Sequence, residues 1–365
     1  MQQPVAIVTF IQDSRFALHK AGPVDYRSSD TNIGIVSAGY FIPDGIITSA
    51  EMARESGLPL NLLSDKFGID CKHIAPADEH PTSMGLKAAE SALKIGNTDP
   101  EEIDLITYCG SGYYDYQFWS PAASIQHTLG AHNAYAFDLK NACNGGNLGI
   151  RVSAMLLAGD PSKRTALVIC SDTLSPVLDY HNRDNLPFFA LADGASAAIL
   201  LKDEPTNTLL SYAGITDGTL DDYVRVSFGG TRTLSNPGHP HDQRHFSVDP
   251  TKALADILPE VFLGNFVEVI RRAVRQSGYE PGQIRWLLTN QIKKTRVLDI
   301  LCALGLNETN TRFTMRNYGS IGPGDTLFSL ALLLEEHLIS PGDLVVLASS
   351  GIGFSWGAQV IRYFA

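Results

Sequence analysis

The segment DLKNACNGGNLGIRVSAMLLAGD, residues 138–160, places a cysteine in a short polar turn ahead of an amphipathic run with helical spacing. A helix N-terminus offers unpaired N–H groups and the positive end of its dipole, and both stabilise a thiolate. The small residues Ala142, Gly145 and Gly146 leave room for a substrate to approach the sulfur of Cys143. Cys143 is therefore a candidate nucleophile. The alternative is a buried cysteine that packs as a small hydrophobic side chain, the commoner fate of a lone cysteine.

Strands and helices alternate on both sides of this turn, which favours an α/β sheet covered by helices on both faces. The first pass predicts strands over 33–43, 103–109, 134–139, 165–172 and 194–201, and helices over 83–96, over 120–131 and after Cys143. The second pass predicts strands over 207–218, 284–291, 343–351 and 356–364, and helices over 257–278, 296–305 and 326–338.

The two passes form a weak pseudo-repeat of roughly 170 residues. We therefore expect an N-terminal extension over 1–30, an N-terminal half over 31–205 and a C-terminal half over 206–365. The segment 229–250 between the passes is rich in glycine, proline and histidine and is predicted to be a loop or lid.

Length, charge and cysteine usage limit the class of protein. A formal charge of −11 over 365 residues argues against a general nucleic-acid binder. No stretch is long enough to span a membrane, and the N-terminus lacks the features of a secretory signal, so we expect a soluble cytoplasmic protein. The odd cysteine count without CxxC spacing argues against a disulfide framework or a zinc site, and no metal or cofactor is expected. The five cysteines are Cys71, Cys109, Cys143, Cys170 and Cys302.

Three of these cysteines, Cys109, Cys170 and Cys302, lie inside apolar runs and are predicted to be buried in the core. Cys71 has no partner that the pattern identifies.

Several short motifs occur in a recognisable order: FGIDCKHIA, TSMGLKAAESALK, SPAASIQHTLGA, FDLKNACNGG, LADGASAAIL and GIGFSWGAQVIRYF. In these motifs the chain resembles the thiolase superfamily, and most closely β-ketoacyl-acyl-carrier-protein synthase III, from about Asn32 to Phe364. The resemblance implies a thiolase-like, duplicated, five-layered αβαβα fold and a homodimer. It also implies that Cys143 is the nucleophile that accepts an acyl group.

The resemblance breaks at the two partners of the cysteine. In the family these are a histidine in a PHQAN turn and an asparagine in an HGN or YGN turn. Here WLLTNQIKK places Asn290 at the histidine, and NYGSIGPGD places Ser320 at the asparagine. Both replacements can donate hydrogen bonds to a thioester carbonyl, whose oxygen becomes negative during decarboxylation. Neither can exchange a proton near neutral pH as histidine does, so decarboxylative condensation is the step most at risk.

An oxyanion hole does not depend on these side chains. The resemblance implies that it uses the backbone N–H of Cys143 and one from the GIGF turn, around Ile352 and Gly353. A histidine displaced from elsewhere is a further alternative: His239, His241 and His245 lie in the predicted lid, where solvated loop histidines are the ordinary expectation.

The family receives its acyl group from coenzyme A or from acyl carrier protein. Its usual coenzyme-binding tryptophan and arginines align near Leu62, Lys66 and Pro176, and these departures favour a carrier-delivered phosphopantetheine arm. Acidic carriers need a local cationic site, for which Lys293, Lys294 and Arg296 are candidates, with Lys66 as an addition. The equally plausible alternative is a solvated, charged helix start.

The loop GSGYYDYQFWSP, residues 110–121, is unusually aromatic. In the family this segment crosses the dimer interface and caps the acyl pocket of the partner, and Phe118 stands at the matching position. Trp119 and the neighbouring tyrosines could narrow that pocket, although aromatic segments are also common in plain interfaces. We expect an interface with a pocket contribution.

Two hypotheses follow. The first is a synthase III-like acyltransferase or condensing enzyme of secondary metabolism that works through an acyl-Cys143 intermediate, with Asn290 and Ser320 orienting the carbonyl. The second is a non-catalytic or partner-dependent subunit that retains the fold and pairs with an active homologue.

Overall fold

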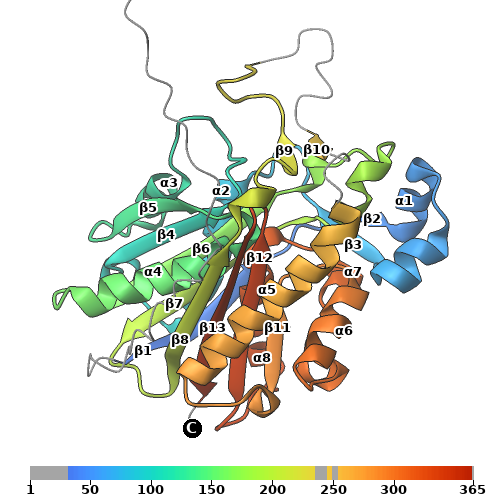
Figure 1. The fold of residues 1–365 in the computed structure, drawn as a ribbon. Coiled ribbons are helices and arrows are strands. Elements are labelled where there is room, and N and C mark those ends of the chain that lie inside the picture. Colours follow the sequence, from blue (N-terminus) through green and yellow to red (C-terminus); the bar gives the residue numbers. More distant parts are fainter. Residues whose placement is uncertain (1–31, 235–244, 249–253, 364–365) are drawn as a thin grey trace, which may run out of the picture.

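The computed structural model describes residues 32–234, 245–248 and 254–363 (Figure 1). The extension predicted over 1–30, and the candidates His239 and His241, lie outside the described residues. Within the described residues, no helix combines the length and the apolar character needed to cross a bilayer.

Nine described strands form one hydrogen-bonded network in the order β11-β12-β13-β8-β1-β7-β6-β4-β5. Five come from the first part of the chain: β1 (Ile33–Phe41), β4 (Leu105–Gly110), β5 (Tyr135–Lys140), β6 (Thr165–Thr173) and β7 (Asp193–Lys202). Four come from the second: β8 (Asn207–Thr216), β11 (Trp286–Thr289), β12 (Leu344–Gly351) and β13 (Ser355–Tyr363). The pair Gly34↔Thr208 is the register contact that joins β1 to β8, so the network is two sheets linked at one point. The half boundary at 205 stays a prediction.

Two helices lie between these sheets. In one buried cluster, Ile150 and Leu157 of α4 (Gly145–Gly159) and Leu330 of α8 (Asp325–Glu335) pack with strand residues from both sheets. Helix α8 is buried around most of its circumference, as expected for a helix between two sheets, because a helix without a polar face must be covered on all sides. These helices form the middle layer.

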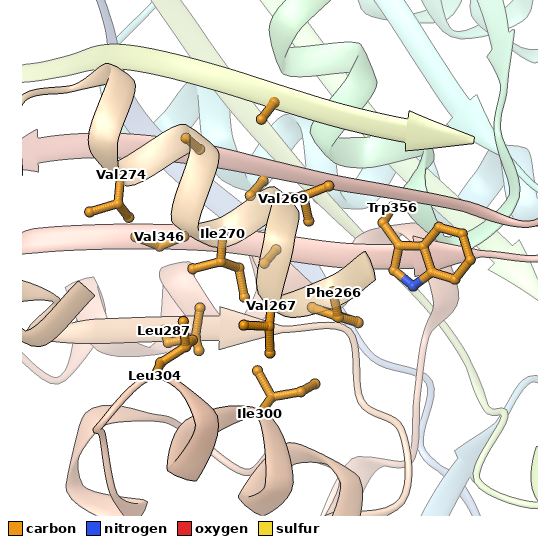
Figure 2. Close-up of a cluster of buried hydrophobic side chains, with 14 of the residues drawn as sticks. Phe266, Val267, Val269, Ile270, Val274, Leu287, Ile300, Leu304, Val346 and Trp356 are labelled. Atoms are coloured by element: carbon orange, nitrogen blue, oxygen red, sulfur yellow. The ribbon is translucent and has the colours of Figure 1, made fainter. Parts of the chain in front are cut away.

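The outer faces of the two sheets carry the remaining long helices. One buried cluster joins α2 (Pro81–Gly96) and α3 (Pro121–Leu129) to the first sheet. Another joins α5 (Leu254–Gln276) and α6 (Lys294–Ala303) to the second, and Figure 2 shows Ile270 of α5 near Val346 of β12 and Val267 of α5 near Ile300 of α6. Figure 1 shows α5 lying across β8, β12 and β13. The five-layered αβαβα fold expected from the sequence is therefore confirmed.

Glycines let the helix after Cys143 approach its neighbours closely. A Cβ on Gly149 would lie 2.3 Å from Cys109 Sγ on β4, and a Cβ on Gly146 would lie 2.3 Å from the carbonyl oxygen of Pro323, just before α8. Both distances are far inside van der Waals contact. The glycines of the NGGNLG segment therefore set the depth at which α4, and with it Cys143, sits in the middle layer.

The long elements predicted from the sequence are confirmed, whereas several short elements were not predicted. These are β2 (Gly45–Thr48), which pairs with β3 (Cys71–Ile74), α1 (Ser49–Ser56), α7 (Met315–Tyr318), and β9 (Val224–Val226), which pairs with β10 (Phe246–Val248). Within the described part of segment 229–250, predicted to be a loop or lid, β10 is an additional short strand. A strand of three residues is too short to show an alternating pattern.

The burial predicted for the cysteines is confirmed for two of three. Cys109 and Cys170 are buried as direct neighbours on β4 and β6. The prediction is wrong for Cys302, which is exposed. Cys302 lies on α6 on the same side as the exposed Thr295 and Asp299, since positions seven and three residues apart share one helix face.

Candidate active site

Cys143 lies in a 3-10 turn, Ala142–Asn144, between the end of β5 and the start of α4. Ala142 has a φ of 45°, in the left-handed region that residues with a Cβ seldom adopt. Such a conformation persists only where the surroundings hold it, and it is common at functional sites. The turn leaves Cys143 partly exposed rather than sealed in the core.

The C-terminal half holds this turn in place. Ser349 Oγ of β12 donates to Asn144 Oδ1 at 2.8 Å, and Ser355 Oγ of β13 donates to Asn141 Oδ1 at 3.1 Å. Gly351 fits tightly against the turn, because a Cβ there would lie 2.6 Å from the carbonyl oxygen of Asn141. Strands from the second half therefore fix the position of a cysteine that belongs to the first.

A second set of buried bonds holds the first turn of α4. Asn147 Nδ2 donates to Ser349 Oγ at 2.9 Å, and Thr326 Oγ1 of α8 donates to Asn147 Oδ1 at 3.2 Å. Because Asn147 is buried, these bonds satisfy polar groups that would otherwise be costly to desolvate.

Cys143 opens on a cavity of about 930 Å³. Asn290, Ser320 and Ile352 also line it, so the structure brings together the residues that the sequence predicted as the catalytic set. Most of the wall is apolar and includes Leu174, Phe188, Leu191, Phe246 and Phe354. Two cationic side chains, Lys140 and Arg225, are part of the lining, whereas no aspartate or glutamate is among the described lining residues.

The thiol of Cys143 is held in its protonated form. Burial raises its pKa to about 12, and the carboxyls of Asp325 and Asp172 raise it further, against a smaller opposing effect of the backbone N–H of Cys143. The expectation that the helix terminus ionises this thiol is therefore wrong: desolvation and two nearby carboxyls outweigh the helix dipole. A base must accept the proton when the sulfur attacks.

Asn290 follows the end of β11 and is buried at the cavity wall. Its Nδ2 donates to the carbonyl oxygen of Ser350 at 3.2 Å, and its Oδ1 accepts from the N–H of Ser350 at 3.1 Å. This pair of bonds fixes the amide plane against β12. An amide nitrogen carries two hydrogens, so the second N–H of Asn290 remains a candidate donor to a bound carbonyl.

Ser320 is also buried, and its hydroxyl is engaged. Its Oγ donates to Asp325 Oδ2 at 2.7 Å and accepts a long bond of 3.4 Å from the N–H of Gly322. While Asp325 is ionised, the hydroxyl hydrogen of Ser320 is directed to that carboxylate. The prediction that Ser320 donates to the thioester carbonyl is therefore wrong for this arrangement, in which Ser320 offers an oxygen lone pair.

Asp325 is the first residue of α8 and is fully buried. Besides the Ser320 hydroxyl it accepts the N–H of Gln291 at 2.7 Å and that of Ile321 at 2.8 Å. Burial raises the pKa of this carboxyl to about 7, and the three hydrogen bonds oppose the rise. Both protonation states are therefore populated near neutral pH.

A second buried carboxyl lies near the thiol. Asp172, in β6, accepts from Ser111 Oγ at 2.7 Å and from the N–H of Ser111 at 3.1 and 3.0 Å. Burial raises its pKa to about 7, and Asp193 raises it further while the Ser111 bonds and Lys140 lower it. A Cβ on Gly322 would lie 3.9 Å from both Asp172 Oδ2 and Cys143 Sγ.

Comparison with known proteins finds similarity to one family in both halves of the chain. Residues 137–218 match 3-oxoacyl-[acyl-carrier-protein] synthase III, and residues 274–363 match the C-terminal part of the same enzyme. The β-ketoacyl-[acyl-carrier-protein] synthase III of Erythrobacter litoralis is 29% identical over 338 residues, which cover 90% of this chain and 98% of that protein. Both halves of the chain are therefore similar to 3-oxoacyl-[acyl-carrier-protein] synthase III.

Solved structures agree on the fold. The synthase III of Aquifex aeolicus superposes with a TM-score of 0.80 at 22% identity, over 91% of this chain and all of that one. The priming β-ketosynthase of the R1128 polyketide pathway superposes with a TM-score of 0.82 at 21% identity, over 91% of this chain and 96% of that one.

The pocket residues predicted for this synthase III-like chain do not line its own cavity. Phe118 is fully exposed with a φ of 55°, and Trp119 is 36% exposed. From the same loop, Tyr113 and Gln117 line the cavity instead. An apolar side chain as exposed as Phe118 is typical of a protein–protein contact surface.

The predicted docking residues lie at the start of α6, next to the cavity-lining Ile292. Lys293 Nζ lies 5.2 Å from the centre of the Phe67 ring. The other two are already paired, Lys294 with Glu308 at 3.7 Å and Arg296 with Asp299 at 3.3 Å. Of the predicted set, Lys293 is therefore the cation most available to an acidic partner.

Two further predictions concern the oxyanion hole and the lid histidines. Of the expected oxyanion-hole pair, Ile352 lines the cavity whereas Gly353 does not. His245 is outside the described cavity lining, and among the described residues no hydrogen bond joins it to Cys143. Nor do three metal-binding side chains cluster anywhere in the described ranges.

The sequence analysis missed Asp325, Asp172 and Lys140. Asp325 opens an apolar helix, where an acidic first residue is an ordinary feature. Asp172 could have been predicted from its position. It lies at the carboxyl end of the buried strand β6, which is parallel to β4, and ligands bind beyond the carboxyl ends of parallel strands. Lys140 could have been noticed as a cation three residues before the nucleophile.

Proposed function

We propose that this synthase III-like enzyme transfers an acyl group from a thioester, delivered by an acyl carrier protein, through an acyl-Cys143 intermediate. One observation carries the proposal: Cys143 stands at a strained turn between β5 and α4 and opens on a cavity of about 930 Å³ that Asn290 and Ser320 also line. We propose that the enzyme acts in the cytoplasm, in secondary metabolism. A solved structure with this fold, the priming β-ketosynthase of the R1128 pathway, belongs to polyketide biosynthesis.

The first half of the reaction forms the acyl-enzyme. The sulfur of Cys143 attacks the thioester carbonyl, the carbonyl bond to the carrier sulfur breaks, and the thiol proton ends on the released carrier thiol. The remaining N–H of Asn290 and the backbone N–H of Cys143 are the donors we assign to the carbonyl oxygen. The acceptor in the second half is either a carbon nucleophile or a heteroatom.

Carrier delivery and dimerisation complete the proposal. Lys293, next to the cavity-lining Ile292, offers positive charge in an otherwise acidic chain, and the exposed Lys66 is a further candidate. Strand β5 is an edge of the sheet, and exposed apolar side chains lie on or near it: Phe118, Tyr135, Met155 and Leu156. We infer a homodimer that covers this edge and brings Phe118 to the cavity of the other copy.

A non-catalytic or partner-dependent subunit is the second candidate. The raised pKa of the Cys143 thiol favours it, because a thiol without a base is a poor nucleophile. Here the fold and interface are retained while an active homologue performs the chemistry.

Intact mass separates the two candidates. The full chain is incubated with carrier-bound acyl thioesters of several chain types, alongside Cys143→Ala and Cys302→Ala. The second variant is the matched control, because Cys302 is the exposed thiol on α6. Acyl transfer predicts an adduct in the wild type and in Cys302→Ala that is lost in Cys143→Ala. No adduct with any donor, together with stable association with a different synthase-like chain, would establish the subunit.

A further inference from the structure

Two serine–aspartate pairs flank Cys143. Ser111 Oγ donates to Asp172 Oδ1 at 2.7 Å, and Ser320 Oγ donates to Asp325 Oδ2 at 2.7 Å. Both serines line the cavity beside Cys143, and both carboxyls are fully buried behind them. Each pair is therefore a short hydrogen-bonded chain from the cavity surface to a carboxylate, which is an arrangement able to accept a proton.

We propose that Asp325, acting through the hydroxyl of Ser320, is the acid and base that serves Cys143 in place of the family histidine, whose position Asn290 occupies. The inference rests on the proposed function for its role in acyl transfer. The removal of the thiol proton, however, can be tested without any acyl donor.

The loop Ser320–Gly322 runs from Ser320, the hydrogen-bond partner of Asp325, toward the thiol. The proposed relay requires Ser320 Oγ to approach Cys143 Sγ, since no hydrogen bond joins the two among the described residues. The N–H of Gly322 points to Ser320 Oγ, and a Cβ on Gly322 would lie 3.9 Å from Cys143 Sγ. Gly322 has a φ of 66°, a conformation that favours glycine, so the loop can fold closely over the sulfur. Of the two carboxyls that act on the thiol, Asp325 has the larger effect.

The second pair is less suited to the role. Ser111 is only half-buried, so water competes for its hydroxyl, whereas Ser320 is 3% exposed. The ammonium of Lys140 acts on Asp172 and favours its charged form, as does the double contact with Ser111. Within the described part of the chain no cation acts on Asp325, and the groups that contact it there are Ser320 and the backbone N–H groups of Gln291 and Ile321.

The proton transfer balances without any further reagent. As the thiol proton of Cys143 moves to Ser320 Oγ, the hydroxyl proton of Ser320 moves to Asp325 Oδ2, which leaves a thiolate and a neutral carboxyl. The thiolate attacks the thioester carbonyl and the carrier thiolate departs. That thiolate takes a proton from Ser320, which recovers one from Asp325.

The test is alkylation of Cys143 by iodoacetamide, a neutral reagent that reacts with the thiolate, in the full chain carrying Cys302→Ala. Rates are followed by intact mass for the parent, Asp325→Asn, Ser320→Ala, Ser111→Ala and Ser329→Ala. Ser329 is a matched control, since it is a buried serine one turn further along α8 whose hydroxyl has no hydrogen-bond partner among the described residues.

The sign of the change distinguishes a base from a nearby charge. If Asp325 acted only as an anion beside the thiol, its neutralisation in Asp325→Asn would lower the pKa of Cys143 and speed alkylation. As a base, its loss slows alkylation, and Ser320→Ala slows it too, each by at least about tenfold given the usual size of acid–base contributions. Ser329→Ala should react as the parent does.

Several outcomes overturn the inference: faster alkylation in Asp325→Asn, an unchanged rate in Ser320→Ala, or a loss confined to Ser111→Ala, which would move the role to Asp172. Ser320→Ala keeps the test decisive if Asp325→Asn does not fold. If Cys143 forms an acyl adduct but Asp325→Asn and Ser320→Ala are alkylated at the parent rate, the relay is refuted and the proposed function stands. Slowed alkylation in both variants without an adduct from any donor supports the relay and refutes the proposed function.

Discussion

Gly146 of α4 lies directly against the backbone of Pro323, so that a Cβ on Gly146 would stand 2.3 Å from the Pro323 carbonyl oxygen and 2.9 Å from Cys170 Sγ. This contact joins the helix that follows the nucleophile to the turn that precedes Asp325. The two halves of the site are therefore set at a fixed separation by a position where no side chain fits.

Gly146→Ala is expected to destabilise the fold. The backbone of Pro323 cannot move aside as a flexible side chain would, so the free energy of unfolding should fall by about 1–3 kcal/mol, the usual cost of overpacking. Gly159→Ala, at the other end of the same helix, is the control, since a Cβ there meets nothing within 4 Å. Urea unfolding measures both, and equal midpoints for the two variants would show that the contact is soft.

Lys72 gives a prediction about stability and pH. It is fully buried, and burial lowers its pKa to about 7 although Asp193 opposes the change. Between pH 7 and the ordinary lysine pKa the unfolded chain therefore binds more protons than the folded chain, so stability rises with pH in that window. Lys72→Met removes this rise.

The measurement is the free energy of unfolding at pH 7 and at pH 9.5. The wild type should gain about 3 kcal/mol relative to Lys72→Met between these values, since each pKa unit corresponds to about 1.4 kcal/mol. Lys94→Met, at an exposed site on α2, should follow the wild type. Parallel pH curves for the wild type and Lys72→Met would contradict the prediction.

Phe118→Asp tests the proposed dimer. Phe118 is fully exposed in the isolated chain, so a carboxylate in its place has little effect on folding. If the position is buried in a dimer interface, desolvation of that carboxylate destabilises the dimer. Sedimentation velocity should show more monomer. The dissociation constant of the dimer should rise by at least about tenfold, which corresponds to about 1.4 kcal/mol of association free energy. Leu338→Asp, at another exposed apolar position, should leave the dimer intact. A monomeric wild type would refute the proposal.

Lys293→Glu tests carrier docking. Reversal of a charge at the rim of a contact mainly slows association, so KM for a carrier-bound donor should rise by about three- to tenfold. The rate with a small pantetheine thioester should not change. Lys94→Glu supplies the control for net charge alone. An equal effect of Lys293→Glu on both donors would place Lys293 in the acyl site instead.

The sequence predicted the long elements well, for a physical reason. Helix α8 and strand β12 are so apolar that burial on all sides is their only stable environment, and α2 shows a clear helical spacing. The order of short motifs around Cys143 indicated the duplicated fold. The same pattern could not predict β10, where three residues carry no period, or the exposure of Cys302.

The sequence by itself determined that Cys143 precedes a helix and that Asn290 and Ser320 replace two partners expected from the resemblance. Only the tertiary structure decided what those residues do. Ser320 donates to Asp325 and not to the cavity, and the thiol is neutral, because the pKa of a group depends on the charges and the burial that distant segments bring to it. Asp325 lies far from Cys143 along the sequence, so no local spacing could connect the two residues. The folding of β12, β13 and α8 against the Cys143 turn creates the site.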